Sequence, residues 1–128
     1  MLGRSRKLRS LIDRFGEDVI HLRRHDGKTT LHCAAIAGNL PGVKYLVMQG
    51  IAVDAQDRQG WTALHYAAGG NHTAIIRFLL ENGADIAKTN SNGQTAYDVS
   101  LQKGFTNASQ ILRQYVSNRA LVAESGDR

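Results

Sequence analysis

Residues 27–35 read Gly27-Lys28-Thr29-Thr30-Leu31-His32-Cys33-Ala34-Ala35, and residues 60–68 repeat them as Gly60-Trp61-Thr62-Ala63-Leu64-His65-Tyr66-Ala67-Ala68. The two copies are 33 residues apart, because 65 minus 32 is 33. The same offset relates Gly50 to Gly83, and Gly60-Trp61-Thr62 returns in weaker form as Gly93-Gln94-Thr95. Several independent matches at one offset indicate a chain built from structural repeats.

Each repeat carries the signals of a turn followed by two short helices. Asp57-Arg58-Gln59-Gly60 is a turn signal, and Thr62 can cap the helix that follows it. The Ala67-Ala68 pair in that helix is small enough to let neighbouring helices approach closely. In the first repeat, Asn39 can cap a second helix with Pro41 in its first turn, where a missing N–H costs little.

The second helix of each repeat has an apolar stripe at helical spacing. Gly50 and Gly83 follow these helices at the position that tolerates a left-handed backbone. One such hairpin is too small to bury its stripe alone, so we expect stacking of neighbouring repeats to complete the core. The stripe residues are Val43, Leu46 and Val47 in one repeat, and Ile76, Leu79 and Leu80 in the next.

The period of 33 residues, with its Thr-x-Leu-His-x-Ala-Ala pattern, resembles the ankyrin repeat over about residues 24 to 116. Both copies lack the usual proline and have Thr30 and Ala63 in its place. The resemblance implies an all-α ankyrin-repeat solenoid of stacked helix-turn-helix units with projecting β-turn or hairpin loops. We expect an N-terminal capping region over residues 1–23, repeats over 24–56 and 57–89, a C-terminal capping repeat over 90–122 and a tail over 123–128.

Both ends of the chain read as caps of the stack. Apolar residues at helical spacing predict a capping helix over residues 5–15. In the third repeat Tyr97-Asp98 replaces Leu-His, a departure that suits a terminal repeat facing water. From about Ala123 we expect a frayed tail. The stripe expected on the last helix consists of Ala108, Ile111, Leu112, Tyr115 and Val116.

Length and composition favour one folded domain. The 128 residues are 42% hydrophobic and 21% charged, which suits one continuous core. Cys33 is the one cysteine, so no intrachain disulfide can form, which favours the cytosol or nucleus. No apolar run approaches the roughly 18 residues of a membrane span. We therefore expect an intracellular protein, cytoplasmic or nuclear.

The residues that could carry chemistry have structural interpretations. The resemblance implies that His32 and His65 hydrogen-bond the turn threonines Thr29 and Thr62 and neighbouring backbone, rather than binding a metal. Cys33 is expected as a small buried residue beside alanines. The sequence has no phosphate-binding loop, dinucleotide fingerprint or nucleophile elbow. We therefore expect no enzyme, no cofactor and no metal.

The resemblance implies a protein-binding module or scaffold that contacts its partner through turn tips and the inner helices. Trp61 is the residue of greatest interest, since an aromatic side chain at a turn can anchor an interface, although it can equally pack over the adjacent turn or helix. The surface is mixed and mildly polar, which favours a protein ligand over a polyanion. The expected partner-facing residues are His25, Asp26, Lys28, Ile36, Arg58, Gln59, Trp61, Tyr66, Ser91, Asn92, Gln94, Gln102 and Lys103.

A different function would reside in the basic N-terminal segment. The net charge is +5, and residues 1–24 hold seven Lys or Arg against three acids. The run around Arg4, Arg6, Lys7 and Arg9 can be a solvated helix face, a nuclear import patch or an anion-binding site. The alternative function is therefore binding of nucleic acid or an anionic surface. In either case we expect a monomer or part of a larger complex.

Overall fold

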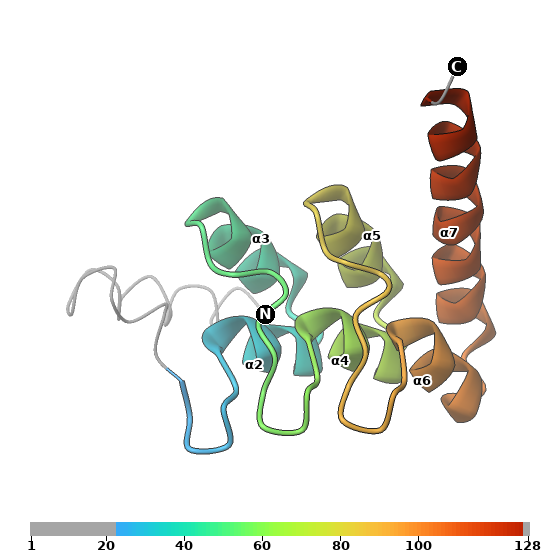
Figure 1. The fold of residues 1–128 in the computed structure, drawn as a ribbon. Coiled ribbons are helices and arrows are strands. Elements are labelled where there is room, and N and C mark those ends of the chain that lie inside the picture. The colour runs from blue at the N-terminus through green and yellow to red at the C-terminus, as the bar shows by residue number, and fades with distance from the viewer. Residues whose placement is uncertain (1–22, 127–128) are drawn as a thin grey trace.

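The computed structural model describes residues 23–126, with side chains described through residue 117, and shows a stack of helical hairpins (Figure 1). The capping helix expected over residues 5–15, with Arg4, Arg6, Lys7 and Arg9, lies outside the described residues. Within 23–126 the extended pairing is limited to an isolated bridge between Arg23 and Thr29. The helices are α2 (Thr30–Ile36), α3 (Leu40–Met48), α4 (Ala63–Gly69), α5 (Thr73–Glu81), α6 (Ala96–Lys103) and α7 (Thr106–Gly126).

The helices form two layers, and a row of turns projects from one of them. Figure 1 shows α2, α4 and α6 side by side in one layer and α3, α5 and α7 in the other, with three turns projecting from the edge of the first layer. Neighbouring inner helices contact each other, as do neighbouring outer helices. This arrangement confirms an all-helical solenoid of hairpins with projecting loops.

Side-chain caps start the inner helices where the sequence predicts them. Thr62 has an extended backbone and accepts a hydrogen bond from the amide of His65, while the His65 side chain bonds the Thr62 amide in return. Thr29 and Thr95 close the same capping box at the starts of α2 and α6. Asn39 caps α3 with Pro41 in the first turn, so both predictions are confirmed.

The core runs between the two layers. Val43, Leu46, Ile76 and Leu79 are completely buried, as the helical stripes predict. Ala35, Ala67 and Ala68 are buried as well, so the inner helices approach closely at their alanines. Of the other residues in the predicted stripes, Leu80 is buried and Val47 is half-buried.

The last helix differs from expectation in two respects. Ala108 and Leu112 are fully buried, but Val116 is 48% exposed, so its assignment to the buried stripe is wrong. At about 100° per residue Val116 lies roughly 80° around the helix from Ala108, at the margin of the stripe. In addition, α7 continues to Gly126, so the frayed tail expected from Ala123 is wrong as far as residue 126. No proline or glycine interrupts the helix before Gly126.

The third repeat lacks two features with which the earlier repeats accept a following repeat. Asp98 stands where the earlier repeats have histidine and closes the capping box through its carboxylate, which accepts from the Thr95 amide at 3.0 Å. Leu101 occupies the position of Ala35 and Ala68, which are fully buried, yet it is 52% exposed. Repeat three therefore presents a different surface at its outer end.

Candidate protein-binding face

The second and third projecting turns are each closed by hydrogen bonds to the side chain of one residue, Asp57 or Asn90. In the second turn the Asp57 Oδ1 accepts hydrogen bonds from the amides of Gln59 and Trp61, at 2.9 and 3.0 Å. Asn90 does the same in the third turn for the amides at positions 92 and 94. Gly60 has φ of +79°, and a Cβ there would lie 2.7 Å from the backbone nitrogen of Ser91. The second turn therefore requires glycine at this position.

Adjacent turns are tied together by bonds that recur at the repeat period. The Arg23 Nη1 donates to the Gln56 carbonyl at 3.0 Å, and the Gln56 Nε2 donates to the Thr89 carbonyl at 2.9 Å. These positions follow each other at intervals of 33 residues. Backbone bonds accompany them, from the Arg58 amide to the Asp26 carbonyl at 3.1 Å and from the Ser91 amide to the Gln59 carbonyl at 2.9 Å.

The two motif histidines link each inner helix to the next turn. His32 and His65 are each only 1% exposed. Their Nδ1 atoms accept from the amides of Thr29 and Thr62 at 3.0 and 3.2 Å, which leaves Nε2 as the donor. Burial lowers the pKa of both imidazoles, so both rings are neutral at pH 7. Their Nε2 atoms bond the carbonyls of Trp61 and Gln94 at 2.8 and 2.9 Å.

Thr29 with His32, and Thr62 with His65, form the capping boxes that start α2 and α4. Each imidazole uses both nitrogens within the fold, one toward its own cap and one toward the next repeat. Neither ring therefore keeps a free nitrogen that could act as a general base.

A buried carboxylate joins the first two turns to the inner helix α4. The Tyr66 hydroxyl donates to the Asp57 Oδ2, and the Asp57 side chain is only 1% exposed. Lys28 lies 3.7 Å from that carboxylate and 3.3 Å from Asp26. Burial opposes ionisation of Asp57, but its hydrogen bonds outweigh burial and lower the pKa. Burial and the bond to Asp57 raise the pKa of Tyr66 to about 12.

Trp61 packs against neighbouring rings and also borders open surface. Its ring centroid lies 4.9 Å from that of Tyr66 and 5.8 Å from that of His65. The Lys28 Nζ lies 5.4 Å from the centre of the Tyr66 ring. Trp61 is only half-buried, so ring packing and exposure to solvent coexist at this residue.

An open groove of about 420 Å³ lies beside Trp61, between the third turn and α6. The Gln94 Nε2 donates to the Gln102 Oε1 at 2.9 Å across it. Val99 is the lining residue that the sequence interpretation missed, and it occupies the repeat position of Tyr66, since 99 minus 66 is 33. The full lining is Trp61, Asn92, Gln94, Val99, Gln102 and Lys103.

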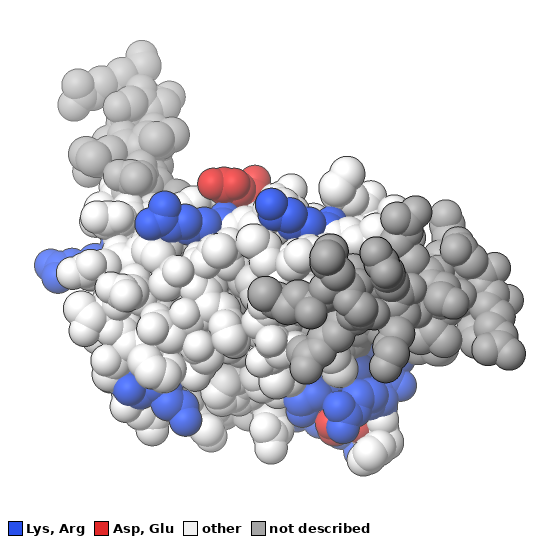
Figure 2. Space-filling model, turned by 180° about the vertical axis from the view of Figure 1, so that it is seen from behind, with Lys and Arg blue, Asp and Glu red and all other residues white. Residues whose placement is uncertain are grey.

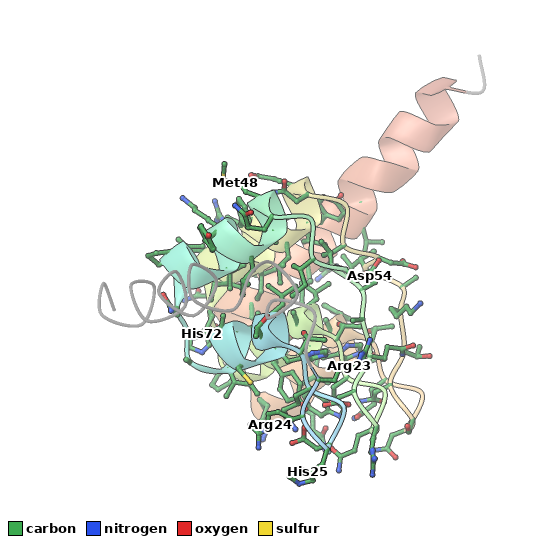
Figure 3. All side chains as sticks on the ribbon, turned by 90° about the vertical axis from the view of Figure 1, so that its left-hand side faces the viewer. Arg23, Arg24, His25, Met48, Asp54 and His72 are labelled. Atoms are coloured by element: carbon green, nitrogen blue, oxygen red, sulfur yellow. The ribbon has the colours of Figure 1, made fainter. Side chains whose placement is uncertain are left out.

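The remaining expected contact residues are more dispersed. His25, Arg58, Gln59 and Ser91 are exposed on the turns. Figure 3 shows Arg23, Arg24 and His25 at the turn side of the molecule, far from Met48. Ile36 is 45% exposed at the end of α2 and does not line the groove.

Cys33 differs from its sequence interpretation. It is half-buried rather than buried, and its sulfur lies 4.0 Å from the Arg24 Nη1. The reason is its repeat position, which is that of Tyr66 and faces the turns rather than the core. Across residues 23–126 no three or more His, Cys, Asp or Glu side chains are grouped so that they could hold a metal ion.

Comparison with known proteins identifies the repeat. The family described as ankyrin repeats (3 copies) matches residues 2–90 and 43–120. Mouse ankyrin repeat and SAM domain-containing protein 6 is 42% identical over 81 residues, which are 62% of this chain and 9% of that protein. Mouse RelA-associated inhibitor is 45% identical over 74 residues, which are 57% of this chain and 9% of that protein.

One relative matches over most of its own length. Human protein phosphatase 1 regulatory subunit 27 is 33% identical over 123 residues, covering 75% of this chain and 80% of that protein. The chain thus spans a small part of the two mouse relatives and most of the human one. No helix in the described part of the chain is long and apolar enough to cross a membrane. The chain belongs to the ankyrin repeat family, whose repeats are protein–protein interaction modules.

Proposed function

We propose that this chain is a non-catalytic module that binds a protein partner through its concave face and turn tips. The observation that carries the proposal is the continuous surface from Lys28 over Tyr66 and Trp61 into the groove that Gln102 borders. Two relatives have regulatory names, a phosphatase regulatory subunit and an inhibitor, which supports a regulatory or scaffold role. The single cysteine supports a cytoplasmic or nuclear location.

The mechanism is recognition by a preorganised surface. The turns are bonded internally by Asp57 and Asn90 and to one another through Gln56. A surface fixed in this way loses little conformational entropy on binding, so more of the contact free energy remains as affinity. Half-buried aromatic side chains beside a groove are the type of residue that contributes most to protein interfaces.

The protonation states support binding rather than catalysis. Both motif histidines use both ring nitrogens inside the fold, and Asp57 is occupied by Tyr66 and two backbone amides. A catalytic site needs titratable groups that converge on a cleft and are free to exchange protons with a substrate. The groove beside Trp61 is instead lined by amide, apolar and lysine side chains.

Affinity capture from nuclease-treated lysate tests the proposal. The wild-type chain is compared with a Trp61→Ala, Arg58→Ala variant and with a Gln102→Ala, Lys103→Ala variant. A matched control carries Lys44→Ala and Arg77→Ala, which remove two exposed cations from α3 and α5 in the outer layer. Circular dichroism checks that every variant keeps its helices.

We expect the same proteins with the wild type and the control, and their loss with both concave-face variants. Capture that is unchanged by both concave-face variants would refute the proposal. If that unchanged capture also collapses in moderate salt, the basic N-terminal segment is the functional surface instead.

A further inference from the structure

The acidic side chains at the first two turns are already neutralised within the protein. Asp26 lies 3.4 Å from Arg24 and 3.3 Å from Lys28. Asp57 is buried and bonded to Tyr66. At the lower edge of the molecule in Figure 2, Lys and Arg side chains surround a smaller acidic area. The turns therefore offer a partner more positive than negative charge.

Two exposed cations, Arg58 at the second turn and Lys103 at the groove, form no ion pair with any described residue. Arg58 extends along the first turn, with its Cγ 3.3 Å from where a Cβ on Gly27 would lie. Lys103 borders the groove beside Trp61. The exposed carboxylate nearest to Lys103 in the sequence is that of Asp98, which is held in the α6 capping box. Both cations are thus available to an incoming anion.

These groups belong to one continuous surface, here named the concave strip: Arg58, Lys28, Tyr66, Trp61, Gln102 and Lys103. Arg58 lies in the turn that bonds between Asp57 and Trp61 close, and the tilted Trp61 ring packs on Tyr66, whose ring centre is 5.4 Å from the Lys28 Nζ. Trp61 also lines the groove that Lys103 borders. We propose that the concave strip binds an acidic, extended segment of the partner protein, an inference that rests on the proposed function. Carboxylates of that segment meet Arg58 and Lys103, and an apolar side chain between them lies against Trp61.

The surface favours a peptide over a nucleic acid. Of the described cations on this side, Arg24 and Lys28 already pair with Asp26, so few remain to hold the phosphates of a nucleic-acid backbone. The groove beside Lys103 contains the side-chain amides of Asn92 and Gln94, which can bond a peptide backbone. Charge at both ends and hydrogen-bonding amides between them match a short acidic chain.

Selection from a phage-displayed library of random short peptides, with the full chain as bait, tests the proposal. The enriched peptides are then labelled with fluorescein, and their binding is measured by anisotropy. The variants are Arg58→Glu and Lys103→Glu. Arg77→Glu is the control, because it makes the same charge change on the outer layer. A labelled DNA duplex serves as a second probe.

We expect enrichment of Asp and Glu in the selected peptides. Each concave-strip variant should weaken binding about tenfold, the effect of losing one charge-assisted contact. The control should change binding less than about twofold, because exposed charges far from the ligand are screened. Equal weakening by all three variants would overturn the proposal. So would a DNA duplex that binds more tightly than the peptides and is lost with Arg58→Glu.

The outcomes also separate this inference from the proposed function. Selected peptides that show no acidic bias, yet lose binding with Trp61→Ala, would overturn the acidic-segment inference and leave the concave face as the binding surface. Peptides that are indifferent to Trp61→Ala and to both charge reversals would overturn the inference and count against the proposed function as well.

Discussion

Mild acid is expected to destabilise this protein through its two motif histidines. In the folded chain His32 and His65 accept a backbone amide at Nδ1, so protonation there removes a buried hydrogen bond. Burial lowers the pKa of both rings below the ordinary value of 6.5. The unfolded chain consequently binds more protons than the folded chain once the pH falls below about 6.5. Stability therefore decreases from that pH down to the folded pKa.

The size of the effect follows from proton linkage. Each histidine contributes a slope of up to about 1.4 kcal/mol per pH unit within that window. At about pH 5.5 the two together remove up to about 3 kcal/mol, a large share of the roughly 5–15 kcal/mol that stabilises a typical domain. The lowered pKa values of Asp26 and Asp57 act separately, because stability from carboxylates is lost only below about pH 4.

Urea unfolding followed by circular dichroism at about pH 7.5, 6.5 and 5.5 measures this loss. His25→Asn is the matched control, because His25 is exposed and its replacement should leave the loss unchanged. Nitrogen NMR of the imidazoles should show the neutral form with the proton on Nε2 in both motif histidines. Constant stability across these pH values, or a proton on Nδ1, would refute the reasoning.

Three further substitutions, two of them with a matched control, test the fold in the same urea assay. Thr62→Ala removes the α4 cap and should cost about 1 kcal/mol, and an unchanged unfolding midpoint would contradict the capping role. Leu79→Ala empties a fully buried position and should cost about 2–5 kcal/mol, while Met48→Ala, at an 80% exposed position, should cost little. Gly60→Ala combines φ of +79° with a 2.7 Å contact and should cost at least about 1–3 kcal/mol. Gly69→Ala, at the last residue of α4 where an added Cβ would lie 3.4 Å from its nearest neighbour, should be neutral or stabilising, and equal losses at the two glycines would oppose this reasoning.

The repeat period predicts the fold well because its signals are local. A threonine that caps a helix or a glycine that ends one acts within a few residues, so Thr62, Asn39 and Gly83 could be placed before any coordinates. The period also predicts that residues at equivalent positions form equivalent hydrogen bonds, and His32 and His65 do so.

The binding face is less predictable because its contacts join different repeat positions. The bond from Tyr66 to Asp57 and the approach of Lys28 to both depend on side chains that do not recur at the repeat period. Cys33 shares the position of Tyr66 but is small, so it leaves that place half-open. The sequence interpretation named most of the groove residues through the family resemblance, yet only the packing shows that Trp61 both stacks and borders open surface.

The bonds between turns make the length of the stack adjustable. Gln56 receives the bond from Arg23 and donates the next one to Thr89, so it serves both of its neighbours. A duplicate of residues 24–56 inserted directly after Gln56 would bring its own copy of that glutamine and would restore the donor and the acceptor at each new junction. The same unit appended after the third repeat would meet Asp98 and Leu101 instead of histidine and alanine. The stack can therefore be lengthened more readily by duplicating residues 24–56 than by adding a repeat at its carboxyl-terminal end.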